Sequence, residues 1–174
     1  MNNVLSLFKD VSCFVFDMDG VLTDGTLLIL PGGVWARKMN IKDGYALQLA
    51  VKKGYKVVII SGSDSGEVRE RLNRLGITDV HMNVKDKAAL LQNLMVDNNL
   101  ERQQVLCMGD DIPDLDMLKS SGLASCPADA VQEIKDVAHY ISPFKGGEGC
   151  VRDVIEKVLK LNEVWNNDTS VASM

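Results

Sequence analysis

Two carboxylates, Asp17 and Asp19, stand two residues apart at the end of an apolar run and directly before Gly20. The apolar residues 14–16 are typical of a buried strand, and Gly20 allows the backbone to turn just beyond it. The two carboxylates therefore leave the sheet at its carboxyl edge, where open α/β sheets bind ligands. Because like charges this close repel each other, the pair indicates a hard divalent cation held by oxygen ligands.

Other polar side chains follow apolar runs further along the chain. Ser61 follows the second run, Asp110 and Asp111 follow the fourth, and Lys87 begins the helix expected after the third. Carboxylates combined with a hydroxyl and an ammonium suit phosphoryl transfer to a carboxylate nucleophile, with a metal and the donors holding the phosphate oxygens. A second carboxylic acid beside the nucleophile can protonate the leaving alkoxide and later activate water.

The elements that must position these groups alternate between strand and helix. The expected strands are 14–16, 56–60, 77–82, 105–108, 123–126 and 139–141. The expected helices run from Asp43 to near Gly54, from Asp64 or Ser65 to Gly76, over 86–98, around Met117, over 131–137 and over 150–164. This alternation predicts an α/β fold of the Rossmann-like, three-layer, parallel-sheet type with right-handed crossovers. We expect one domain over residues 1–174.

One insertion interrupts this alternation near the site. Residues 26–30 and 34–39 are extended runs on either side of a Pro-Gly-Gly turn, a pattern that predicts a β-hairpin over about 26–39 in place of a cap domain. Its apolar side chains need a partner surface. We interpret the hairpin as an oligomer contact; the alternative is that it folds back on its own domain.

The composition excludes several classes of protein. The chain has 174 residues, 46% of them apolar, and a formal net charge of −5. This charge argues against a general nucleic-acid or membrane-surface role, and no apolar run approaches the ~20 residues of a membrane span. The four cysteines are far apart, so we expect free thiols in a reducing cytoplasm. Residues 1–9 should form a short lead-in without a signal peptide, and residues 165–174 a frayed tail.

The order of these motifs resembles the haloacid dehalogenase superfamily of phosphatases. The resemblance rests on residues 17–24, on Ser61, on Lys87 (preferred to Lys85 from register) and on residues 109–114. It implies that Asp17 is the nucleophile and Asp19 the general acid/base, with Ser61 and Lys87 completing the catalytic set.

The same resemblance implies a magnesium cofactor. Its ligands would be Asp17, the backbone carbonyl of Asp19, and Asp110. Asp111 and Asp114 either support these ligands or fix the loop. We interpret Asp24 as a turn-forming residue.

A narrower resemblance is to the small capless branch that includes 3-deoxy-D-manno-octulosonate 8-phosphate (KDO 8-phosphate) phosphatases. It rests on residues 22–25, the hairpin, residues 40–44 and the glycine-rich residues 146–152. It implies a homotetramer in which hairpins form a central barrel and a neighbouring subunit helps to close each site, with residues 146–149 reaching toward that neighbour. The implied substrate contacts are Asn40, Asp43, Gly44, Gln48, Ser63 and Arg71.

The chain departs from this branch at one position. Relatives usually have Gly-Arg after the second strand, whereas this chain has Gly62 and Ser63. A serine cannot make the bidentate contact with a carboxylate that an arginine makes. Arg71 and Arg74 lie one turn apart on the following helix and offer a positive charge for the sugar carboxylate instead. The alternative is that Arg74 is only a surface charge. The expected reaction is therefore magnesium-dependent hydrolysis of a 2-keto-3-deoxy sugar acid phosphate through an aspartyl-phosphate, with 2-keto-3-deoxynonulosonate 9-phosphate as the alternative substrate.

Two functions of other classes stay open from the sequence. One is a phospho-accepting signalling domain, and the other is a non-catalytic tetramerisation module. A signalling domain usually separates its acidic pair from its acceptor aspartate, whereas here the pair itself ends the first strand. Steady-state phosphate release distinguishes these two functions from a phosphatase. A signalling domain would hold one phosphate per chain, and an assembly module would release none.

Overall fold

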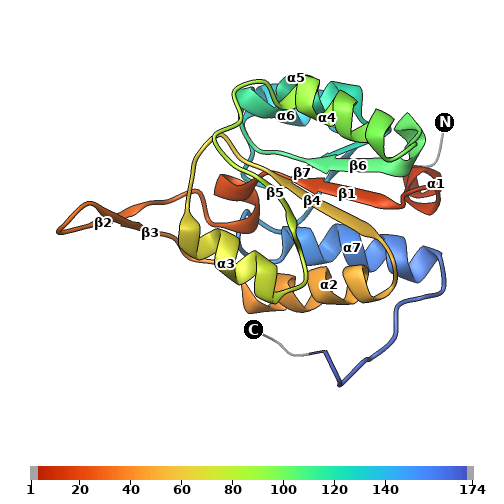
Figure 1. Ribbon diagram of the computed structural model, residues 1–174. Coiled ribbons are helices and arrows are strands. Elements are labelled where there is room, and N and C mark those ends of the chain that lie inside the picture. Colours follow the sequence, from red (N-terminus) through yellow and green to blue (C-terminus); the bar gives the residue numbers. More distant parts are fainter. Residues whose placement is uncertain (1–3, 172–174) are drawn as a thin grey trace.

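Six parallel strands form the central sheet of the computed structural model, which describes residues 4–171 (Figure 1). The strand order is β5-β4-β1-β6-β7-β8. The strands are β1 Cys13–Phe16, β4 Lys56–Ile60, β5 Asp79–His81, β6 Val105–Met108, β7 Leu123–Cys126 and β8 Tyr140–Ile141. β1 pairs with β4 on one side and β6 on the other, and its four side chains are all buried, as expected for a strand covered on both faces. The predicted α/β parallel sheet is confirmed.

Helices cover both faces of this sheet (Figure 1). One face carries α2 Ile41–Lys52, α3 Gly66–Arg74 and α7 Cys150–Leu161, and the other carries α4 Lys87–Asp97, α5 Leu115–Ser120 and α6 Gln132–Val137. Side chains along a strand point alternately to opposite faces. Phe14 and Phe16 therefore belong to the core under α2 and α7, while Cys13 and Val15 belong to the core under α4 and α5. This arrangement is the expected three-layer architecture.

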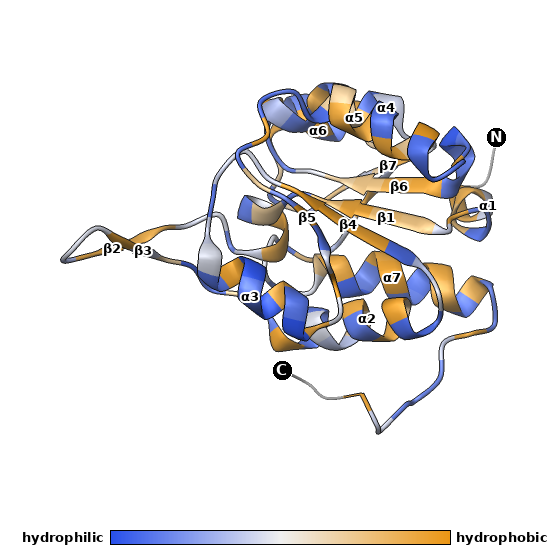
Figure 2. Ribbon diagram, in the orientation of Figure 1, coloured by the Kyte–Doolittle hydropathy of each residue, from blue (hydrophilic) through white to orange (hydrophobic). Residues whose placement is uncertain are grey.

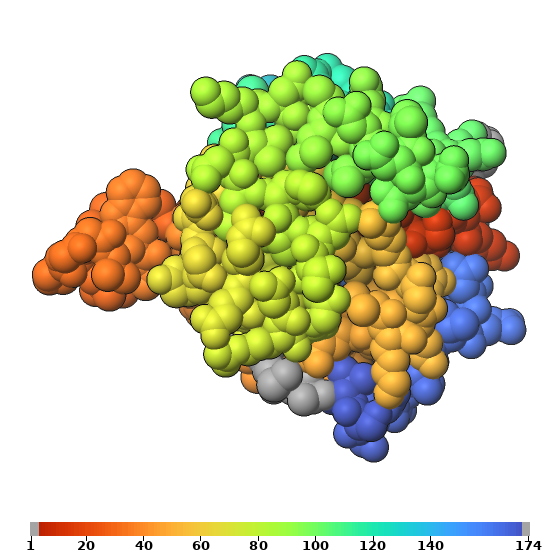
Figure 3. Space-filling model, viewed as in Figure 1, coloured from red at the N-terminus to blue at the C-terminus, as the bar shows by residue number. Residues whose placement is uncertain are grey.

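The predicted hairpin is present as β2 Leu28–Leu30 and β3 Val34–Ala36, which pair antiparallel. Gly32 and Gly33 have φ angles of +85° and +79°, which a tight hairpin turn needs and glycine adopts without strain. The hairpin projects from the body of the molecule (Figures 1 and 3) and is largely apolar (Figure 2). The alternative that it folds back on its own domain is therefore wrong.

The glycine-rich segment before α7 lies against the chain's own acidic loop. The backbone amide of Gly147 donates to the Val21 carbonyl oxygen at 2.9 Å. A Cβ atom at Gly146 would lie 1.9 Å from the Gly20 carbonyl oxygen, so only glycine permits this approach. Residues 146–149 thus support the loop after β1 within the same chain, and their contact with a neighbouring subunit stays a prediction.

Both ends of the described chain pack against the body of the domain. The lead-in contains a helix, α1 Val4–Lys9. The Trp165 ring meets the Tyr45 ring edge-on at 6.2 Å between centroids, and Lys52 Nζ lies 2.7 Å from Asp168 Oδ2. Residues 165–171 make these contacts without forming a helix or strand, and fraying there stays a prediction. Residues 1–3 and 172–174 lie outside the described part.

Two expectations from composition agree with the structure. All four cysteines are buried free thiols, and burial raises the pKa of Cys13 to about 12, which leaves that thiol unreactive. Within residues 4–171 the structure has no helix of the length and apolarity that crossing a bilayer would require.

Asp43 lies in the first turn of α2 and is 2% exposed. Its Oδ1 accepts a hydrogen bond from the backbone amide of Arg152 at 2.7 Å, in the first turn of α7. Its Oδ2 is buried and has no hydrogen-bond partner among the described residues. Burial raises the pKa of Asp43 to about 6, with the amides of Arg152 and Gly149 opposing that shift. In this chain Asp43 joins α2 to α7, and its contact with substrate stays a prediction.

This burial predicts a pH-dependent stability. A raised pKa in the folded state means that protonated Asp43 contributes stability below about pH 4, and that this contribution is lost as the pH rises through about 6. We expect Asp43→Asn to gain up to about 3 kcal/mol in free energy of unfolding relative to wild type between about pH 4 and about pH 7.5. Urea unfolding at several pH values measures this difference.

The matched control is Asp97→Asn, which changes an exposed aspartate at the end of α4. The difference in free energy of unfolding between Asp97→Asn and the wild type should stay constant over the same pH range. A constant difference for Asp43→Asn as well would contradict the prediction.

Candidate active site

Three carboxylates meet at the carboxyl edge of the sheet. Asp17 follows β1, Asp110 follows β6, and Asp114 ends the short 3₁₀ turn Ile112–Asp114. One oxygen from each lies within 4.8 Å of the others. Asp17 and Asp114 are almost fully buried. The parallel register of β1 and β6 brings these residues together across 93 positions of sequence, which is what the spacing of the motifs predicted.

Two glycines make this close approach possible. Gly20 has a φ of +88°, and a Cβ atom there would lie 2.1 Å from Asp110 Oδ2. A Cβ atom at Gly109 would lie 2.4 Å from the Cβ of Asp114. Because carbon atoms cannot approach so closely, any larger residue at either position would push a carboxylate out of the cluster.

Lys87 supplies the positive charge in the cluster. Its Nζ donates to Asp17 Oδ1 at 2.7 Å and to Asp114 Oδ1 at 2.6 Å. Burial lowers the pKa of Lys87, but the two carboxylates outweigh it and the net shift is upward. The carboxylate of Asp86 accepts the Ala89 amide and so caps α4, which fixes the first turn of the helix. Lys85 also lines the pocket, but among the described residues only Lys87 forms an ion pair with Asp17.

The cluster remains short of positive charge. With its three carboxylates ionised and Lys87 protonated, it would carry a net charge of about −2, which one divalent cation neutralises. Burial, and then the charge of Asp114, raise the pKa of Asp17 to about 7 despite Lys87. Burial, and then the charge of Asp17, raise the pKa of Asp110 to about 8. These shifts reflect burial first and then the repulsion between the carboxylates, which a bound cation would reduce.

The remaining lone pairs indicate which carboxylates fit a metal. Asp114 uses one oxygen on Lys87 and the other on the Asp110 amide, which donates at 3.0 Å. In the described part of the chain, neither a hydrogen bond nor an ion pair reaches the Asp110 side chain. Asp17 uses Oδ1 on Lys87, so its Oδ2 is available to a metal ion. Asp17 and Asp110 therefore fit a divalent cation best, while Asp114 fixes the loop. Asp111 caps that turn by accepting the Ile112 amide.

A pocket of about 310 Å³ opens over the cluster. It is lined by Asp17, Asp19, Gly25, Ser61, Gly62, Ser63, Val84, Lys85, Lys87, Asp110, Asp111, Pro113 and Asp114. The Ser61 hydroxyl accepts from the Ser63 amide at 3.1 Å. The pocket therefore gathers all four predicted catalytic residues.

Most of the predicted substrate contacts lie elsewhere. Asn40, Gly44, Gln48 and Arg71 are not among the residues that line this pocket. Asn40 caps α2 by accepting the Lys42 amide at 2.8 Å. Arg71 lines a second cleft, of about 380 Å³, between the hairpin and α3. Contact of these residues with substrate stays a prediction.

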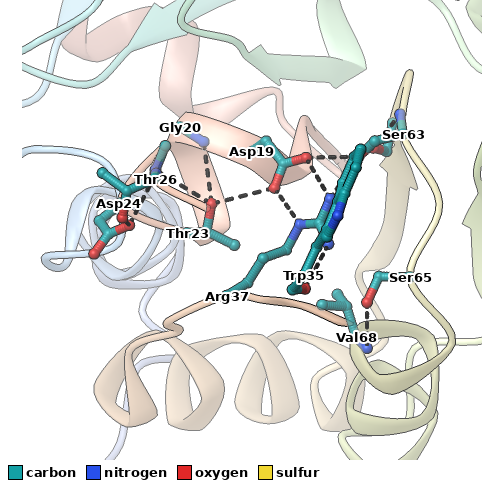
Figure 4. A network of polar contacts seen from close by, with 12 residues as sticks. Asp19, Gly20, Thr23, Asp24, Thr26, Trp35, Arg37, Ser63, Ser65 and Val68 are labelled. Atoms are coloured by element: carbon teal, nitrogen blue, oxygen red, sulfur yellow. Dashed lines mark hydrogen bonds and ion pairs between the residues drawn. The ribbon is translucent and has the colours of Figure 1, made fainter. Parts of the chain in front are cut away.

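Asp19 lies in a polar network that the sequence did not predict (Figure 4). Arg37, just after β3, donates to Asp19 Oδ1 at 2.7 Å and to Oδ2 at 3.3 Å. Ser63 donates to Asp19 Oδ2 at 2.6 Å. No pattern singled out Arg37, since a charged residue at the base of a hairpin usually faces solvent. Asp24 accepts the Thr26 amide at 3.0 Å, which confirms its turn-forming role.

Known proteins resemble this chain in sequence and in fold. A family model of haloacid dehalogenase-like hydrolases matches residues 77–154. The 3-deoxy-D-manno-octulosonate 8-phosphate phosphatase of Yersinia pestis is 30% identical over 98% of this chain and 91% of that protein. The chain belongs to the haloacid dehalogenase-like hydrolase family. It is a phosphoric monoester hydrolase.

Solved structures agree closely with this fold. A Moraxella catarrhalis 3-deoxy-D-manno-octulosonate 8-phosphate phosphatase, in complex with magnesium, phosphate and KDO, superposes with a TM-score of 0.90 at 30% identity, covering 94% of this chain and 95% of that one. The cobalt-bound Haemophilus influenzae enzyme gives a TM-score of 0.87 at 26% identity, covering 94% and 96%.

The raised pKa values of this hydrolase predict pH-dependent metal binding. A divalent cation binds the ionised carboxylates, so below about pH 7 it must displace protons from Asp17 and Asp110. We expect the affinity for Mg²⁺ to rise at least about tenfold between about pH 6 and about pH 8. Titration calorimetry with Mg²⁺ alone measures this, and proton release should shrink as the pH rises.

Two neighbouring substitutions provide the control. Asp110→Asn should lower Mg²⁺ affinity by at least about 100-fold, whereas Asp111→Asn keeps its capping oxygen and should change it less than about fivefold. Equal losses in the two variants, or an affinity independent of pH in the wild type, would contradict the ligand assignment.

Proposed function

We propose that this hydrolase is a magnesium-dependent phosphatase that hydrolyses a 2-keto-3-deoxy sugar acid phosphate of the KDO 8-phosphate type. The observation that carries the proposal is the geometry of the carboxylate cluster. Asp17 is paired there with Lys87, and Asp110 lies beside it with carboxylate oxygens that no other described residue contacts. Relatives of that substrate class match almost the whole chain. We place the enzyme in the cytoplasm.

Asp17, Asp110 and the backbone carbonyl of Asp19 would hold Mg²⁺. When bound, the ion supplies positive charge to the phosphate oxygens and to the attacking carboxylate. Lys87 and Ser61 would hold the remaining phosphate oxygens, one through its ammonium and the other through its hydroxyl. Two of the predicted donors therefore flank the nucleophile in one pocket.

The reaction then proceeds in two transfers. In the first, a carboxylate oxygen of Asp17 attacks phosphorus, the ester bond breaks, and Asp19 gives its proton to the leaving alkoxide. In the second, Asp19 takes a proton from water as that water attacks the aspartyl-phosphate. Inorganic phosphate leaves, and Asp17 and protonated Asp19 are restored.

The nine-carbon substrate 2-keto-3-deoxynonulosonate 9-phosphate remains the alternative, and Ser63 is the observation that favours it. Its hydroxyl donates to Asp19 at 2.6 Å rather than opening toward a ligand. A sugar carboxylate would need a cation from another position, and Arg71 in the adjacent cleft is one source. The substrate carboxylate is then recognised differently from the usual Gly-Arg pattern of the branch.

Phosphate release tests the proposed function. The wild type should release inorganic phosphate from KDO 8-phosphate in the presence of Mg²⁺, faster than from the nine-carbon phosphate. Asp17→Asn should lower kcat by at least about 10⁴-fold, because it removes the nucleophile and a metal ligand. Circular dichroism should show an intact fold.

Asp24→Asn is the matched control, since this turn residue keeps an accepting oxygen for Thr26. It should retain activity within about threefold. Full turnover by Asp17→Asn would contradict the assignment of Asp17 as the nucleophile. One phosphate retained per chain would indicate a signalling domain, and no release by the wild type from either substrate would favour an assembly module.

We also propose a homotetramer assembled through the hairpin. Ile29 and Trp35 face each other across its two strands and are 70% and 56% exposed. Exposed apolar surface of this kind is typical of an interface. The projection of the hairpin from the body places this surface where another subunit can reach it.

The double substitution Ile29→Glu and Trp35→Glu tests this assembly. Burying these charges in an interface is unfavourable, so the mass by light scattering should fall from about four times 19.1 kDa to one chain, with a loss of activity. Val96→Glu changes an equally exposed apolar residue on α4 and should leave the mass unchanged. A double variant that stays tetrameric would show that the hairpin is not the interface.

A further inference from the structure

One side chain of the hairpin points inward although most of the hairpin is exposed. Arg37 follows β3 directly, and its side chain is only 4% exposed. Its neighbour Lys38 is exposed, and Met39 forms an isolated bridge with Thr23 that fixes the base of the hairpin on the acidic loop. Burying an arginine is costly unless its donors are paired, so the contacts of this guanidinium need an explanation.

Those contacts converge on one carboxylate (Figure 4). Arg37 Nε lies 2.7 Å from Asp19 Oδ1, and Nη2 lies 3.3 Å from Oδ2. Nη2 also donates to the Ser63 hydroxyl at 3.3 Å, and that hydroxyl donates to Asp19 Oδ2 at 2.6 Å. Thr23 adds a longer contact to Oδ1 at 3.4 Å. Both oxygens of Asp19 are thus held by donors from three separate segments.

We propose that Arg37 is a positioning residue that holds the Asp19 carboxyl group in the orientation it needs at the leaving group. When Asp19 carries its proton on Oδ2, the 2.6 Å contact runs from that O–H to the Ser63 hydroxyl, and Arg37 still donates to Oδ1. A planar guanidinium bound to both oxygens restricts the rotation of a carboxylate, which a single ammonium cannot do. Arg37 does not line the pocket over Asp17. It lines the neighbouring cleft instead, so it reaches the chemistry through Asp19.

This inference rests on the proposed role of Asp19 as the donor of the leaving-group proton. That role makes a specific demand on substrates. An alkoxide needs a proton as its ester bond breaks, whereas p-nitrophenolate is a stable anion and needs none. Loss of Arg37 should therefore affect alkyl phosphates far more than p-nitrophenyl phosphate. A purely structural role would affect both alike.

The test compares kcat/KM for KDO 8-phosphate and for p-nitrophenyl phosphate, because this ratio reports only the steps through transfer to Asp17. For Arg37→Met we expect a fall of at least about 30-fold with the sugar phosphate and of less than about threefold with the aryl phosphate. Arg37→Lys should lie between Arg37→Met and wild type. Lys38→Met, the same loss of charge one residue along, should match the wild type on both substrates.

A double-substitution cycle with Asp19→Asn separates positioning from direct substrate contact. If Arg37 acts through Asp19, Arg37→Met should cost less than about threefold further in the Asp19→Asn background. A full, additive loss in that background would overturn the proposal in favour of a substrate contact. Equal losses on both substrates, or none on either, would also overturn it.

Failure of the proposed function looks different from failure of this inference. In the first case the wild type releases no phosphate from either substrate. In the second the wild type is active on both, and only the pattern of the Arg37 variants differs. Circular dichroism and light scattering on each variant show whether fold and mass are retained. Arg37→Lys preserves the charge and serves as the second variant if Arg37→Met does not fold.

Discussion

Repulsion among three clustered carboxylates, two of them buried, is the constraint that the rest of the structure satisfies. Asp17, Asp110 and Asp114 each place an oxygen within 4.8 Å of the others, with one lysine among them. In water such a cluster would separate or take up protons. Here the sheet prevents separation, since Asp17 and Asp110 continue two hydrogen-bonded strands whose side chains are wholly buried. Burial, and then the neighbouring carboxylates, raise the pKa values of Asp17 and Asp110.

The loops around this cluster are shaped by the same constraint. The backbone turns at Gly20, which has a positive φ and lies against the Asp110 side chain. Gly146 lies against the carbonyl oxygen of Gly20. The loop after β1 is therefore held between the metal-binding edge and the start of α7. Glycine adopts this backbone conformation without strain, and the neighbouring groups leave no room for a side chain there. The glycine-rich segment thus contributes to the site by support, although it does not line the pocket.

Much of this arrangement could be predicted from sequence, because it depends on short-range patterns and on one topological rule. Apolar runs such as residues 105–108 identify parallel strands, and polar residues at their ends must meet at one edge. Register along the chain was enough to prefer Lys87. The role of Asp43 could not be predicted, since its partner amide on α7 lies 109 residues away. Trp165 likewise packs on Tyr45 only because α2 and α7 lie side by side.

Arg37 was missed for a different physical reason. Its direction depends on how the hairpin leaves the body, and that angle is set by the bridge between Met39 and Thr23, which no local pattern encodes. Arg37 also donates to the carbonyl oxygen of Trp35 at 3.4 Å, so the exposed apolar side chains of β3 and the buried guanidinium just after it lie on one short segment of the chain. If the hairpin is the subunit interface, contact with a neighbour fixes the segment that holds Asp19. In that case assembly and proton transfer are coupled through a single side chain, without any neighbouring residue having to enter the pocket.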